Sequence, residues 1–148
     1  MEIEMMRNGS PLLIVEDNET DVMCLKKAFE KNGIGKTILT ASNGEEALSY
    51  LANDFLEQGG RIPNLILLDL NMPIMNGFEF LAAVKADDRL KAIPVVILTS
   101  STSRMDMNGS YSNSAAGYIE KPMDPEEYLD IVRVLDQYWS LNHLPTIN

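Results

Sequence analysis

Short apolar runs alternate with longer segments of helical periodicity along this chain, and this alternation constrains the fold more than any other feature. Runs of four or five apolar residues that are closed by polar or turn-forming residues are typical of strands buried on both faces of a parallel sheet. Such runs occupy residues 12–15, 65–68 and 94–98, and two less apolar strand candidates occupy residues 37–41 and 116–120. Strands that alternate with helices in this way predict an α/β domain with a parallel sheet and right-handed crossovers.

The segments between these runs have the apolar spacing of amphipathic helices. In residues 19–32, for example, apolar residues recur every three or four positions. We expect the last helix to begin near Asp124-Pro125, an N-cap followed by proline, and to reach Leu141. Segment 102–115 is expected to be a poor helix, because Asn108-Gly109 and several serines have low helix propensity.

Length and composition limit the classes of protein to which the chain can belong. Its 148 residues predict one domain, which we place at 11–141 between flexible tails at 1–10 and 142–148. A formal net charge of −10 argues against a nucleic-acid surface. The chain has no apolar run near the ~20 residues of a membrane span, and its N-terminus lacks a signal-peptide pattern. The single cysteine, Cys24, excludes an internal disulfide and fits a reducing compartment. We therefore expect a cytoplasmic protein without a nucleic-acid or membrane partner.

Polar side chains follow four of the five predicted strands at the point where each strand ends. Glu16 and Asp17 follow the first strand, Asp69 the third, Thr99 the fourth and Lys121 the fifth. Each alone is an ordinary residue for a turn that leads into a helix. In a doubly wound sheet, however, the carboxyl ends of the strands share one edge, where ligands bind.

This combination of residues suits phosphoryl transfer. Three nearby carboxylates repel one another unless a cation holds them, and hard oxygen ligands favour Mg²⁺. Lys121 and the Thr99 hydroxyl can neutralise or bind two further phosphoryl oxygens. Asp69 is the candidate nucleophile, because carboxylates form acyl phosphates in other phosphotransfer proteins.

Four motifs in this order resemble the receiver domain of bacterial two-component response regulators. They are Glu16-Asp17, the stretch Asp-Leu-Asn-Met-Pro-Ile-Met-Asn-Gly at 69–77, Thr99-Ser100 and Lys121-Pro122. The resemblance covers about residues 11–141. It implies a flavodoxin-like, doubly wound five-stranded parallel sheet with helices on both faces. It also implies a single-domain response regulator, a phosphoacceptor signalling domain that catalyses only its own phosphorylation and dephosphorylation.

The resemblance implies a role for each acidic residue of the site. Asp69 would be the phosphoacceptor and, together with Asp17, would bind Mg²⁺ directly. The backbone carbonyl of Asn71 would be a third ligand, and Glu16 would act largely through water. The phosphoryl donor in this family is a phosphohistidine on a sensor histidine kinase.

Three further residues would read out the phosphorylation. Lys121 would contact the phosphoryl group, across a cis peptide to Pro122. Thr99 would be the switch hydroxyl, and Tyr118, three residues before Lys121, the switch aromatic. We expect Thr99 to move toward the phosphoryl group and so to free space into which Tyr118 turns, with segment 102–115 as the mobile element.

A narrower resemblance concerns the partners. The loop at 59–63 and the Tyr138-Trp139 ending, followed by Leu144-Pro145, are similar to stand-alone regulators that partner phytochrome-type sensor histidine kinases. Surplus apolar residues on the last helix further suggest a homodimer through the fourth helix, the fifth strand and the fifth helix.

Three other classes of protein compete with this interpretation. A small aspartyl-nucleophile phosphohydrolase would need a second Asp at the position of Asn71 as general acid. A flavodoxin-like cofactor carrier would need a phosphate-binding loop where Glu16 and Asp17 lie. A scaffolding pseudo-receiver would lack Asp69, Lys121 or a member of the acidic pair Glu16-Asp17, and the chain retains all of these residues.

Overall fold

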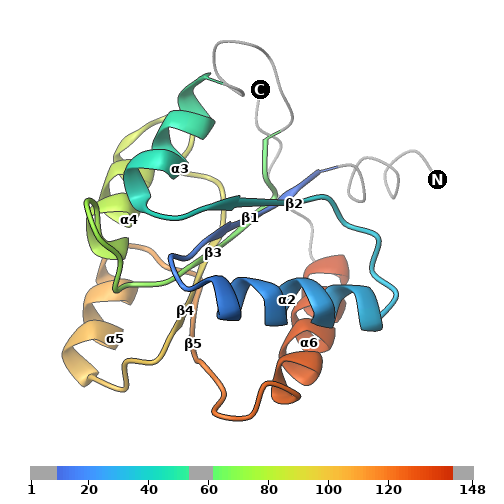
Figure 1. The fold of residues 1–148 in the computed structure, drawn as a ribbon. Helices are drawn as coiled ribbons and strands as arrows, with labels where there is room; N and C mark the ends of the chain where they lie inside the picture. Colours follow the sequence, from blue (N-terminus) through green and yellow to red (C-terminus); the bar gives the residue numbers. More distant parts are fainter. Residues whose placement is uncertain (1–9, 54–61, 142–148) are drawn as a thin grey trace.

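The computed structural model describes residues 10–53 and 62–141 (Figure 1). The predicted tails, apart from Ser10, and most of the 59–63 loop lie outside these residues. The described part contains one parallel sheet of five strands in the order β2-β1-β3-β4-β5. The strands are β1 (Leu12–Val15), β2 (Ile38–Ala41), β3 (Leu65–Leu68), β4 (Val95–Thr99) and β5 (Gly117–Glu120). This order is that of a flavodoxin-like doubly wound sheet, so the predicted fold class is confirmed.

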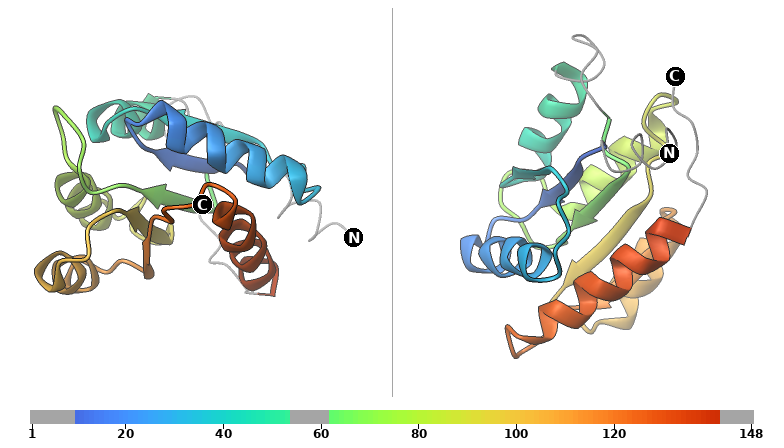
Figure 2. Two further views of the ribbon diagram at one scale, coloured as in Figure 1. Left: turned by 60° about the horizontal axis from the view of Figure 1, so that its bottom comes forward. Right: turned by 90° about the vertical axis from the view of Figure 1, so that its right-hand side faces the viewer.

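The helices cover both faces of this sheet, which lies between them in both views of Figure 2. They are α2 (Glu19–Lys31), α3 (Gly44–Tyr50), α4 (Gly77–Ala86), α5 (Arg104–Ser112) and α6 (Glu127–Leu141). The central strands contribute alternate residues to two separate cores. Leu13 and Val15 pack with residues of α3 and α4, whereas Leu12 and Ile14 pack with residues of α2 and α6. Burial on both faces explains why these strands are continuous apolar runs in the sequence.

Helix α5 occupies the segment that was expected to be a poor helix. Its Ser103 N-cap accepts a hydrogen bond from the backbone of Asp106, at 3.3 Å. The fully buried Ser110 donates its hydroxyl to the Asp106 carbonyl at 2.8 Å. Local caps and burial therefore supply the stabilisation that helix propensity does not.

Helix α6 begins two residues later than the sequence predicts. Asp124 caps the preceding turn, since its Oδ1 accepts a hydrogen bond from the backbone N–H of Glu126 at 3.0 Å. Tyr128, Val132 and Leu135 of α6 are buried against the sheet, but Tyr138 is 57% exposed. No helix in the described part of the chain is both long and apolar enough to cross a bilayer.

Candidate functional site

The site lies at the carboxyl edge of the sheet, between β1 and β3. These two strands pair directly, with Val15 opposite Leu68, and Asp69 donates its backbone N–H to the Val15 carbonyl at 3.0 Å. Glu16 and Asp69, the residues that follow the two strands, therefore lie side by side. The chain leaves β1 and β3 in opposite directions to reach its neighbouring strands, and this is the position where doubly wound sheets bind ligands.

Three carboxylates gather at this edge as the sequence predicts. Glu16, Asp17 and Asp69 each offer an oxygen within 4.8 Å of the others. Glu16 and Asp69 are each only 6% exposed, whereas Asp17 is exposed at the mouth of an open depression that Asn71 also lines. Burial and the charge of Asp69 raise the pKa of Glu16 to about 8, although its hydrogen bond to Lys121 opposes this. Two buried acids and one exposed acid, all with oxygen ligands, fit a hard divalent cation that keeps part of its water shell.

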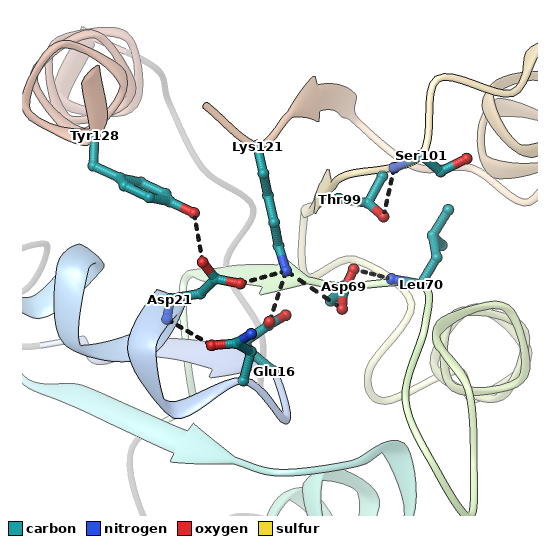
Figure 3. Close-up of polar contacts among 9 residues, drawn as sticks. Glu16, Asp21, Asp69, Leu70, Thr99, Ser101, Lys121 and Tyr128 are labelled. Carbon is teal, nitrogen blue, oxygen red and sulfur yellow. Dashed lines mark hydrogen bonds and ion pairs between the residues drawn. The ribbon is translucent and has the colours of Figure 1, made fainter. Parts of the chain in front are cut away.

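Lys121 faces these acids from the end of β5 (Figure 3). Its Nζ lies 2.7 Å from Glu16 Oε1 and 3.5 Å from Asp69 Oδ2. Burial alone would lower the pKa of Lys121, but its hydrogen bonds to carboxylates outweigh this and raise it above the usual range. The predicted cis peptide before Pro122 is wrong, because every peptide bond among the described residues is trans. Lys121 reaches both acids from the trans form, which X–Pro bonds prefer by about 0.5–1 kcal/mol.

A fourth acid, Asp21, belongs to the same cluster and was missed by the sequence reasoning. Its Oδ2 lies 2.8 Å from Lys121 Nζ, and its Oδ1 accepts a hydrogen bond from the Tyr128 hydroxyl at 3.2 Å (Figure 3). Lys121 holds the pKa of Asp21 below its ordinary value even though burial opposes this. Its position in the first turn of α2, just after the acidic strand end, is a signal that could have identified it. Tyr128 carries no such signal, because it lies on the apolar stripe of α6.

The two predicted switch residues meet at the backbone of Ser101. Thr99 is fully buried at the end of β4, and its Oγ1 accepts a hydrogen bond from the Ser101 N–H at 3.3 Å (Figure 3). Tyr118 is half-buried on β5 and donates its hydroxyl to the Ser101 carbonyl at 2.9 Å. The Ser101 side chain donates in turn to Asp106 Oδ2 of α5, at 2.6 Å. Thr99 and Tyr118 are thus connected through Ser101 to each other and to α5.

The loop from β3 to α4 fixes the backbone of Asp69. Asn76 forms a capping box with Glu79 that starts α4. Gly77 donates its N–H to the Leu70 carbonyl at 3.0 Å and lies so close to the strand end that a Cβ would meet the Asp69 carbonyl oxygen at 2.3 Å. Within this loop, Ile74 has a left-handed φ of 67°. Its side chain is 74% exposed, so packing does not compensate for this strain.

Comparison with known proteins agrees with this geometry. The family model described as response regulator receiver domain matches residues 12–133. A probable methanogenesis regulatory protein, FilR2 of Methanothrix harundinacea, is 41% identical over 129 residues, which are 86% of this chain and 82% of the relative. The response regulator Rcp1 of Synechocystis is 31% identical over 128 residues, 86% of this chain and 87% of that one.

Solved structures give the same result. The crystal structure of the phosphorylated cyanobacterial phytochrome response regulator RcpA matches with a TM-score of 0.85 and 33% identity, and covers 93% of this chain and 99% of that chain. The Mn²⁺-bound form of Rcp1 matches with a TM-score of 0.82 at 30% identity and the same coverage. The sheet order, the acidic cluster beside a lysine and the match along most of the sequence all agree, and the chain belongs to the response regulator receiver domain family.

Proposed function

We propose that Asp69 accepts a phosphoryl group from a phosphohistidine of a sensor histidine kinase, in a reaction that depends on Mg²⁺. The observation that carries this proposal is the position of Lys121 Nζ, 3.5 Å from Asp69 Oδ2, beside three carboxylates that can share one ion. Membership of the receiver family supports a signalling role. The site residues have the chemical groups that the transfer requires.

The residues of the chain divide the work of this transfer. A carboxylate oxygen of Asp69 forms the new bond to phosphorus, while the bond from phosphorus to the imidazole nitrogen of the donor breaks. Lys121 compensates negative charge on one phosphoryl oxygen, and the Thr99 hydroxyl can donate to another after it leaves the Ser101 N–H. Asp17 and Asp69, with Glu16 largely through water, would hold Mg²⁺, and the bound ion would supply further positive charge.

The residue two positions after Asp69 favours a switch over a turnover enzyme. It is Asn71, which is exposed in the same depression and cannot serve as the general acid of a phosphohydrolase. We propose that its backbone carbonyl is a ligand to the cation and that the protein catalyses only its own phosphorylation and dephosphorylation.

The phosphoryl group would change the protein surface through Ser101. A Thr99 hydroxyl that turns toward the phosphoryl group releases the Ser101 N–H, and the same peptide region holds the Tyr118 hydroxyl. A loop that moves there shifts Asp106 and helix α5 through the Ser101 side chain. An almost complete population reversal needs ~5.5 kcal/mol of differential interaction, which charge-assisted bonds to a phosphoryl group can supply.

We further propose a phytochrome-type kinase as the partner and the cytoplasm as the place of the exchange. The likeness to the phytochrome response regulator RcpA supports the partner. A homodimer through α5, β5 and α6 is proposed on the basis of exposed apolar side chains, namely 50% exposed Tyr111 on α5 and 54% exposed Val134 on α6. Sedimentation with and without beryllofluoride tests the dimer, and a monomer in both conditions would contradict it.

Incubation with acetyl phosphate and Mg²⁺, followed by intact mass spectrometry, tests the main proposal. We expect the gain of one phosphoryl group, its loss in Asp69→Asn, and no gain when a chelator removes the cation. Labelling that persists in Asp69→Asn would assign the acceptor to another residue and refute the proposal.

A further inference from the structure

Lys121 has an acidic partner, Asp21, that is neither the phosphoacceptor nor one of the acids that can share a cation. An ammonium group has three N–H donors. Two of them are engaged by Glu16 Oε1 at 2.7 Å and Asp21 Oδ2 at 2.8 Å. The third partner, Asp69 Oδ2, lies farther away at 3.5 Å. The two short bonds therefore fix the ammonium group and leave one donor for Asp69 (Figure 3).

Of these two short contacts, only the one to Asp21 is independent of the cation. Glu16 belongs to the group of acids whose oxygens can share an ion, and Asp21 does not. A cation would draw charge from Glu16 and weaken its hold on Lys121. Asp21 is left as the partner whose charge is available to Lys121 whether or not a cation is bound.

Asp21 is itself held at both ends of its carboxylate. Its backbone N–H donates to the side chain of the N-cap residue Asn18 at 3.1 Å, which anchors the first turn of α2. The second carboxylate oxygen, Oδ1, accepts from the hydroxyl of Tyr128 on α6, and Tyr128 is only 3% exposed. The carboxylate thus has both oxygens engaged and little freedom to rotate.

We propose that Asp21, supported by Tyr128, is a positioning residue that orients the Lys121 ammonium group so that its remaining donor faces the phosphoryl group on Asp69. This proposal rests on the proposed function of Asp69. It adds two residues from α2 and α6 to the phosphotransfer machinery. Without Asp21 the ammonium group keeps its charge but loses one of the two bonds that fix its direction.

Three variants separate positioning from simple electrostatics. Asp21→Asn removes the charge and weakens the bond to Lys121, while Glu19→Gln removes one charge from an exposed position in the same helical turn. Tyr128→Phe removes only the hydroxyl and leaves every charge in place. We expect acetyl phosphate to label Asp21→Asn about tenfold more slowly than wild type and Tyr128→Phe about threefold more slowly. Glu19→Gln should stay within about twofold, as weakly coupled surface charges do.

A second measurement does not require phosphorylation. In ¹⁵N spectra of lysine side chains, assigned with Lys121→Gln, the ammonium signal of Lys121 should shift in Asp21→Asn and stay in place in Glu19→Gln. The signal of Lys85, whose Nζ donates to the carbonyls of Lys91 and Ile93, is the internal reference.

The two proposals fail in different ways. A wild-type protein that is not labelled refutes the proposed function, and the Lys121 signal then still decides whether Asp21 orients this lysine. Normal wild-type labelling, with equal rates in Asp21→Asn and Glu19→Gln and an unmoved Lys121 signal, refutes the role of Asp21 alone.

Discussion

Replacement of Gly77 by alanine should damage both the stability and the chemistry of the site. The new Cβ would lie 2.3 Å from the Asp69 carbonyl oxygen and 2.7 Å from Leu70 Cα. Both are backbone atoms, so relief requires the strand end or the start of α4 to move by about 1 Å. Overpacking of this kind costs about 1–3 kcal/mol. Loss of the hydrogen bond from Gly77 to the Leu70 carbonyl would cost about 1 kcal/mol more. The higher helix propensity of alanine offsets up to about 1 kcal/mol of this cost.

We therefore expect Gly77→Ala to lower the free energy of unfolding by about 2 kcal/mol, measured by urea denaturation with circular dichroism. A displacement of about 1 Å at Asp69 should also slow labelling by acetyl phosphate by about tenfold or more. Gly117→Ala is the matched control, because its Cβ would meet the Val96 methyl groups at an ordinary 3.7 Å. That variant should be as stable as wild type or slightly more stable. A Gly77→Ala protein with wild-type stability and labelling rate would show that the close approach to Asp69 does not constrain the site.

Two further predictions concern strain and pH. Ile74→Gly should raise the free energy of unfolding by about 1 kcal/mol, because glycine tolerates the positive φ and the lost side chain is 74% exposed. The control variant Ile74→Ala keeps the Cβ and should bring no such gain. Equal stabilities of the two variants would exclude backbone strain. In the presence of a chelator, the free energy of unfolding should fall as the pH rises from 5 to 8, by at most about 1.4 kcal/mol per pH unit. The reason is that the folded state raises the pKa of Glu16 to about 8 and so binds its proton more tightly than the unfolded chain does. Glu16→Gln should flatten this pH dependence, and added Mg²⁺ should oppose the loss of stability at high pH. A pH dependence that is unchanged in Glu16→Gln would show that other groups cause it.

The strand ends were the most predictable part of this protein. Strands β1 and β3 are buried on both faces, so each is a continuous apolar run that ends at the first charged residue, and Glu16 and Asp69 could be assigned to one edge without coordinates. Lys121 follows β5, which already contains the charged Glu120, and the alternation of strands and helices assigned it to the same edge. The helices that depend on strong caps and regular apolar spacing were predictable for the same reason. Segment 104–112 was not, because its helix depends on Ser110 being buried, and burial is a property of the packed domain.

The residue pattern of the chain therefore determined the elements, the edge of the sheet that carries the chemistry and the family whose motifs it contains. Only the tertiary structure decided that β1 lies directly beside β3, because strand order is set by crossovers that leave no periodic trace in the sequence. Packing likewise decided that Tyr128, on a helix stripe typical of a core residue, meets Asp21 from 107 positions away. Contacts between residues so distant in sequence depend on how two helices are placed on the same face of the sheet, and that placement follows from the packing of the whole domain.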